Sequence, residues 1–114
     1  MPEATFKQGN PLMVDHTPGS AVAAGEVLVA SGVCRIAHLD MASGDLGALA
    51  AGGGVYDVAR LADGSDDWAD GVQIFWDASE NRATTASTGN THLGYAVGAV
   101  TGTAASGMVH HTPA

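Results

Sequence analysis

Aromatic residues are scarce in this 114-residue chain, and most of them fall between residues 53 and 77. That stretch holds both tryptophans, one of the two tyrosines and one of the two phenylalanines, although aromatic residues make up only 5% of the sequence. Because aromatic side chains bury more area than other types, this stretch has to anchor whatever core the chain forms. The core anchors that the sequence predicts are Tyr56, Val58, Trp68, Val72, Ile74 and Trp76.

Two segments of this stretch have patterns typical of β-strands. Residues 55–60 mix β-branched and polar side chains after a run of glycines, and residues 72–77 alternate apolar and polar positions. The polar residues between them are too few for a domain and predict a loop, in which Gly71 turns the chain into the second strand. The simplest interpretation is a plain hairpin that forms the core and has no function of its own.

Short strand-like segments separated by glycine turns recur along the rest of the chain. Residues 25–30 and 33–38 flank a Ser-Gly turn and predict an antiparallel hairpin. Residues 21–24 could form a helical turn, and residues 46–51 a strand or a helical turn. Further strands are expected at residues 5–8, 82–85, 92–100 and 108–110. Since no segment has the periodicity of an amphipathic helix, the sequence predicts an all-β fold, either a small β-barrel or a β-sandwich.

The length predicts one domain with a thin core. Hydrophobic residues make up 46% of the sequence, but many of them are alanine, and there are 16 glycines. Alanine and glycine each bury little area, so the chain would gain stability from burial between subunits. We therefore expect it to form an oligomer.

The first 20 residues differ from the rest of the chain, because they show almost no periodicity and contain Pro11 and Pro18 in early turns. We interpret residues 1–20 as an extended N-terminal arm and residues 21–114 as a β-rich body. A disordered tail is the alternative, but Phe6 and the apolar residues 12–14 would serve as anchors.

The charge of the chain argues against several kinds of partner. Twelve acidic residues against four scattered basic ones give a formal charge of −8. Without a basic patch to neutralise phosphates, neither nucleic acid nor an anionic membrane surface is an expected partner. No apolar run approaches the roughly 20 residues that span a bilayer, and the first residues do not form a signal peptide. We expect synthesis in a cytoplasm.

The sequence shows no recognisable motif for catalysis or metal binding. Cys34 lies in an apolar run, which favours a buried, inert thiol. The five histidines lack metal-ligand spacing, and the adjacent His110 and His111 would point to opposite faces of a strand. The acidic loop at residues 63–67 lacks the glycine and the final acid of a calcium-binding loop, so a solvated loop is the better interpretation. We expect no enzymatic activity, no metal and no cofactor.

A series of sequence blocks spread over nearly the whole chain has a familiar order and spacing. They are Ala-Ala-Gly-Glu-Val-Leu-Val (23–29), Gly-Asp-Leu-Gly-Ala-Leu (44–49), Gly-Val-Tyr-Asp-Val (54–58), Trp-Ala-Asp-Gly-Val (68–72), Phe-Trp-Asp (75–77), Ala-Thr-Thr (83–85) and Gly-Asn-Thr-His-Leu-Gly-Tyr-Ala (89–96). Together with the opening Met-Pro-Glu-Ala-Thr-Phe, they resemble the small capsid cement, or head decoration, proteins of tailed phages. The chain departs from the family pattern at Ala59 and Arg60, where many members carry Pro-Lys, and in its last seven residues.

The resemblance implies a β-rich, β-tulip-like protein that binds the outer surface of the expanded phage head. Such proteins form homotrimers at three-fold and quasi-three-fold positions, where they clamp neighbouring major capsid subunits. The N-terminal arm would lie across a capsid subunit and pair with it as a strand, which adds backbone hydrogen bonds. The arm residues expected to contact the capsid are Thr5, Phe6, Lys7, Leu12, Met13 and Val14.

Two other classes of function stay open at this point. A virion-surface module that recognises a host glycan would need exposed aromatic rings, for which Tyr95 and Trp68 are the candidates. A small hydrolase would need histidines and acids that cluster in space. Burial of both rings would remove the first role from them, and separation of the polar groups would remove the second.

Overall fold

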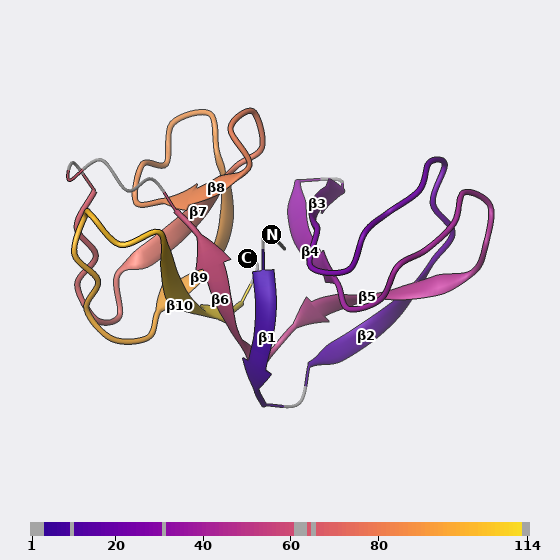
Figure 1. Ribbon diagram of the computed structural model, residues 1–114, viewed down its shortest axis with the longest axis horizontal. Helices are drawn as coiled ribbons and strands as arrows, with labels where there is room; N and C mark the ends of the chain where they lie inside the picture. The colour runs from indigo at the N-terminus through magenta and orange to yellow at the C-terminus, as the bar shows by residue number, and fades with distance from the viewer. Residues whose placement is uncertain (1–3, 10, 31, 61–63, 65, 113–114) are drawn as a thin grey trace.

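The computed structural model describes residues 4–9, 11–30, 32–60, 64 and 66–112. Within these residues the protein is all-β, with ten strands in two antiparallel sheets and no helix (Figure 1). The strands are β1 (Ala4–Gln8), β2 (Leu12–His16), β3 (Val27–Ala30), β4 (Val33–Ala37), β5 (Gly47–Gly52), β6 (Val55–Ala59), β7 (Gln73–Asp77), β8 (Arg82–Thr84), β9 (Thr91–Ala96) and β10 (Ser106–His111). The all-β prediction is confirmed, and of the two predicted architectures the arrangement is sandwich-like, because the sheets do not close into a barrel.

The larger sheet has six strands in the order β1-β6-β10-β9-β7-β8. The predicted hairpin of residues 55–60 and 72–77 is therefore wrong, since β10 and β9 lie between β6 and β7. Both edges of β6 are occupied, by β1 and by β10, so β6 has no free edge left for β7. An isolated parallel bridge between Arg60 and Ala83 brings the end of β6 beside β8, which curls the sheet back toward itself.

The smaller sheet has four strands in the order β2-β5-β4-β3. The predicted hairpin of residues 25–30 and 33–38 is confirmed as β3 and β4, and Gly32 turns the chain between them at a φ of +77°. Residues 46–51 supply strand β5 rather than a helical turn. Residues 21–24 form no helical turn, because Val22 instead makes an antiparallel bridge to Met41.

The predicted strand at residues 92–100 is shorter in the structure. Strand β9 ends at Ala96, and Gly98 then adopts a φ of +83°, which is incompatible with a continuing strand. Val100 pairs with Trp68 in an isolated bridge instead of extending β9. The other short strands that were predicted correspond to β1, β8 and β10.

The N-terminal residues contribute one strand to each sheet. Strand β1 pairs with β6 and strand β2 pairs with β5, so each lies at the edge of its sheet. The two crossings between the sheets, at residues 8–12 and 52–55, lie side by side: a Cβ atom on Gly9 would lie 2.8 Å from the Cα of Gly54. The sheets are thus joined at one end and diverge toward the other (Figure 1).

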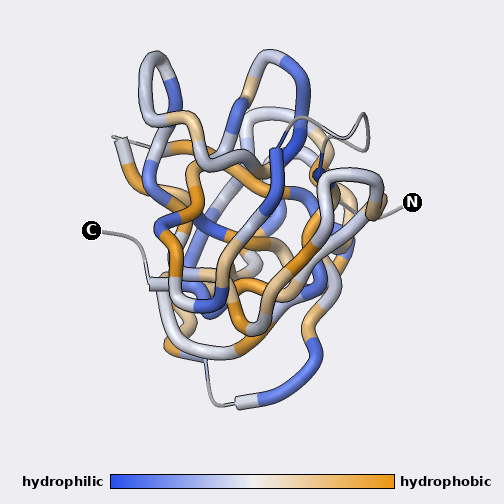
Figure 2. Tube along the Cα trace, turned by 90° about the vertical axis from the view of Figure 1, so that its left-hand side faces the viewer, coloured by the Kyte–Doolittle hydropathy of each residue, from blue (hydrophilic) through white to orange (hydrophobic). Residues whose placement is uncertain are grey.

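Most of the core lies where the two sheets face each other. The larger cluster of buried side chains includes Val27, Cys34 and Ile36 of the smaller sheet and Ile74 and Trp76 of the larger one. Figure 2 shows hydrophobic segments running through the middle of the molecule and hydrophilic residues in several of its loops. The predicted anchors Tyr56, Val58, Trp68, Ile74 and Trp76 are buried, and Val72 is partly buried against the same cluster.

Candidate interaction surface

The outer edge of strand β1 faces the smaller sheet. The backbone N–H of Ala4 donates to the carbonyl of Gly25 over 2.8 Å, so this group points away from β6. Because backbone groups point alternately to the two sides of a strand, the N–H and C=O of Phe6 face the same outer edge. No hydrogen bond joins these two groups of Phe6 to another described residue across that edge. The outer edge of β1 is thus occupied by Gly25 at Ala4, whereas the outward groups of Phe6 have no such partner among the described residues.

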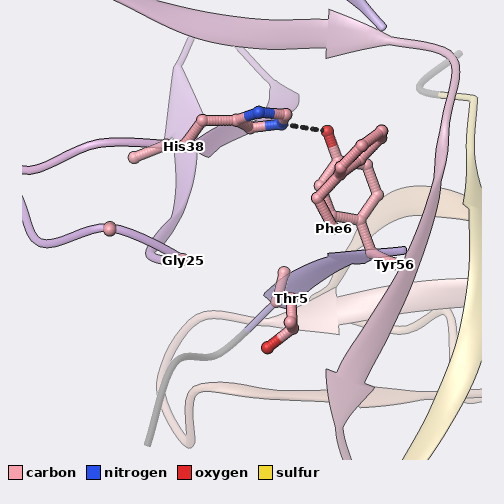
Figure 3. A pocket seen from close by; sticks show the side chains of 8 residues that line it. Thr5, Phe6, Gly25, His38 and Tyr56 are labelled. Atoms are coloured by element: carbon pink, nitrogen blue, oxygen red, sulfur yellow. Dashed lines mark hydrogen bonds between the residues drawn. The ribbon is translucent and has the colours of Figure 1, made fainter. Parts of the chain in front are cut away.

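A hollow of about 320 Å³ opens beside this edge, between the two sheets, and we name it the inter-sheet hollow. The His38 ring points toward the Tyr56 hydroxyl and shares a hydrogen bond of 2.6 Å with it (Figure 3). The Phe6 ring packs against both, with ring centroids 5.1 Å from His38 and 5.5 Å from Tyr56. The residues that line the hollow are Ala4, Thr5, Phe6, Ala24, Gly25, Ala37, His38 and Tyr56.

A second hollow of about 270 Å³ is also lined by His38, and we name it the leucine hollow. Leu39 and Leu46 on its walls are 75% and 72% exposed, which is high for large apolar side chains. Asp40 and Asp45 are exposed among the same lining residues. The full lining is Met13, His38, Leu39, Asp40, Met41, Ala42, Asp45, Leu46, Gly47 and Ala48. Since His38 lines both hollows, they are adjacent, and we refer to the two together as the groove.

Two histidines form hydrogen bonds that join the two sheets, and one of them, His38, also lines the groove. His38, which follows β4, bonds to Tyr56 of β6, and the Nε2–H of His111 in β10 donates to the carbonyl of Cys34 in β4 over 2.9 Å. Burial lowers the pKa of both histidines and raises that of Tyr56 to about 12. The Nδ1 of His111 is buried without a hydrogen-bond partner, so His111 is held as a neutral ring. Burial also raises the pKa of the Cys34 thiol to about 12, as expected for an inert thiol.

The connection between β6 and β7, which contains the acidic loop, is held in place by its own aspartates. Asp67 accepts a hydrogen bond from the backbone N–H of Gly102, and Asp70 accepts one from that of Gly98. Asp66 accepts bonds from the backbone and the hydroxyl of Thr85. These carboxylates therefore connect the loop to neighbouring turns.

Arg60, at which the chain departs from the family pattern, is buried. Its guanidinium donates to the carbonyls of Asp66, Thr101 and Ala104 and lies 4.9 Å from the ring of Trp68. Its role in the structure is therefore to hold two connections together.

The part of the chain that the structure describes contains no group of three or more histidine, cysteine or acidic side chains able to hold a metal ion. The same residues include no helix long and apolar enough to cross a membrane.

The residues expected to contact a capsid lie on the two edge strands. Thr5 and Phe6 of β1 line the inter-sheet hollow, and Met13 of β2 lines the leucine hollow. Lys7 and Leu12 are exposed outside both hollows, whereas Val14 packs against the smaller core cluster.

Leu39 and Leu46 were not singled out from the sequence. The signal that could have found them is a pair of leucines, each beside an aspartate, in turn-forming segments that offer them no buried position.

The two rings considered for glycan binding lie in different environments. Trp68 is buried, so it cannot stack on a sugar, whereas Tyr95 is 41% exposed next to the ring of His92. These two residues therefore do not provide a pair of exposed rings.

An all-β body whose N-terminal strands lie at the sheet edges, beside hollows lined by exposed apolar side chains, has features of a protein-binding module. A family model described as phage cement protein matches residues 6–111. No curated protein and no solved structure matches the chain. The chain belongs to the phage cement protein family, and its role is that of a structural component of the phage capsid.

Proposed function

We propose that the protein binds the outer surface of the expanded phage head as a homotrimer and stabilises contacts between major capsid subunits. Family membership supports the capsid role. The observation that carries the finer proposal is the position of the N-terminal residues, which supply one edge strand of each sheet. An edge strand presents a row of unpaired backbone groups, and this is the feature that a partner chain uses to add a strand.

In this proposal the capsid subunit binds along the edges of β1 and β2. The contact residues are Thr5, Phe6 and Lys7 of β1 and Leu12, Met13 and Val14 of β2. Backbone pairing supplies affinity that does not depend on sequence, while Phe6 and Leu12, which are 39% and 68% exposed, add apolar contacts. A trimer would present three copies of these edges at once. Linked weak contacts of this kind raise the overall affinity without any stronger individual contact.

The sharpest test uses the outward-facing N–H of Phe6. Phe6→Pro removes this donor without breaking the ladder to β6, because edge strands tolerate proline where the N–H faces outward. Phe6→Ala is the matched control, since it removes the ring and keeps the donor. We expect Phe6→Pro to bind expanded heads at least about tenfold more weakly than Phe6→Ala in a co-sedimentation assay, the loss that a few lost contacts bring.

Equal binding by the two variants would show that β1 does not pair with a capsid strand. Circular dichroism and thermal unfolding of both variants check that the sheets are intact. Point substitution is preferable to deletion of residues 2–14, because that deletion would also remove the buried Ala4 and the partly buried Val14 from the core.

A further inference from the structure

We infer that the groove formed by the inter-sheet and leucine hollows seats an extended apolar segment of the major capsid protein that carries a basic residue beside its apolar side chains. This inference rests on the proposed function and names the surface and the chemistry through which the capsid is recognised. It adds Leu39 and Leu46, which lie outside the N-terminal segment, to the contact surface.

Large apolar side chains line both hollows of the groove. Phe6 lines the inter-sheet hollow, and Met13, Leu39 and Leu46 line the leucine hollow. The four large apolar side chains among them are between 39% and 75% exposed. Soluble proteins rarely leave such side chains together in a hollow unless a partner covers them.

The shape of the groove suits an extended peptide better than a small molecule. Its two hollows, of about 320 and 270 Å³, are at or below the small end of ligand pockets, which run from about 300 to 1,000 Å³. The open edge of β1 borders the first hollow and offers the N–H and C=O of Phe6 for strand pairing. A strand bound there would place alternate side chains toward the hollows, as in other cases of strand addition.

The charge at the groove selects a basic partner. Asp40 and Asp45 are exposed beside Leu39 and Leu46, and Asp40 is held in place by the backbone N–H of Ala24, 2.7 Å from its Oδ1. A second copy of the chain is a poor occupant of this groove, because it has only four basic residues that could pair with these carboxylates. An acidic partner would be repelled by Asp40 and Asp45, whereas a lysine or arginine on the partner would be attracted to them.

The test compares charge insertion inside and outside the groove. The variant Leu39→Asp/Leu46→Asp places two charges in the leucine hollow, and Val97→Asp is the matched control, since Val97 is 39% exposed beyond the end of β9. We expect the double variant to bind expanded heads at least about tenfold more weakly than wild type, while Val97→Asp binds as wild type. The mass of the free double variant should match that of wild-type protein.

A second arm tests the charge. Asp45→Lys should weaken binding to expanded heads and reduce its dependence on salt, because it removes an attraction that salt screens. Unchanged or stronger binding by this variant would overturn the basic-partner part of the inference.

The remaining outcomes are distinguishable. If wild-type protein fails to bind expanded heads, the proposed function is wrong. If wild type binds and Leu39→Asp/Leu46→Asp binds equally well, the groove is not the capsid contact. A changed mass of the free double variant would assign the groove to contacts between copies of the chain. An equal loss of head binding by Val97→Asp would show a general effect of added charge. Either result overturns the inference.

Discussion

Arg60 shows how one buried cation can hold a loop-rich region together. Its guanidinium donates to three carbonyl oxygens from two different connections and packs over Trp68, and it is only 5% exposed. A planar group with several donors suits this arrangement better than an ammonium group does. Removing the side chain would leave the carbonyls of Asp66, Thr101 and Ala104, whose bonds to Arg60 are partly buried, without this donor.

We therefore predict that Arg60→Ala lowers the free energy of unfolding by about 2–4 kcal/mol, because three partly buried acceptors lose their charged donor and Trp68 loses a packing surface. Arg60→Lys keeps the charge but not the fork of donors and should lose less. Urea unfolding of the three proteins measures the difference. A change within about 0.5 kcal/mol for Arg60→Ala, as at an ordinary surface site, would contradict this role.

The neutral state of His111 makes stability depend on pH. In the folded protein burial lowers its pKa, and the nearby His38 and His110 also disfavour a charge there. In the unfolded chain the pKa of histidine returns to about 6.5, so below that pH the unfolded state binds more protons than the folded state. The free energy of unfolding should therefore fall as pH decreases below about 6.5, with little contribution from this group above that pH.

Comparing wild type with His111→Gln isolates this effect. Glutamine can still donate from its Nε2 to the Cys34 carbonyl but does not titrate. We expect the variant to lose less of its unfolding free energy than wild type does between pH 7.5 and pH 5.5 in urea titrations. The same loss in both proteins would mean that other groups cause the pH dependence.

At the scale of strands and hairpins, the sequence predicts pairing between neighbouring segments but not between segments far apart in the chain. The hairpin of β3 and β4 is specified by a turn within the sequence, at Gly32, so it was predictable. The neighbours of β6 are β1 and β10, which lie far from it in the chain, and no periodicity within residues 53–77 indicates them. Strand β2 was missed because its short apolar run follows Pro11 and lacks strict alternation.

The candidate groove was predictable only in part for the same reason. Phe6 and Met13 are apolar residues in a segment with no buried pattern, which marked them as contact residues. Leu39 and Leu46 join them only because the turns after β4 and before β5 meet beside β2. The turn around each leucine indicates that its side chain is exposed, but the meeting of the two turns is a property of the folded sheet.

At the scale of the whole molecule, the core is small and alanine-rich, so association would add to stability. We predict that the free protein sediments at three times the mass of the chain, and that the midpoint of urea unfolding rises with protein concentration, as for a folded state stabilised by assembly. Sedimentation over a hundredfold range of concentration measures both the mass and its dependence on dilution. A single-chain mass throughout that range would restrict trimer formation to the capsid surface.

The position of β6 between β1 and β10 also sets the order in which the protein can fold. Strand β10 connects β6 to β9, β7 and β8, so the six-stranded sheet cannot be completed until residues 106–111 have been synthesised. Contacts between such distant segments form slowly, because a long loop has to close first. A chain whose synthesis stops before β10 can pair β1 with β6 but lacks the strand that connects this pair to β9. Only chains that contain β10 can therefore present the β1 edge on a complete sheet for assembly.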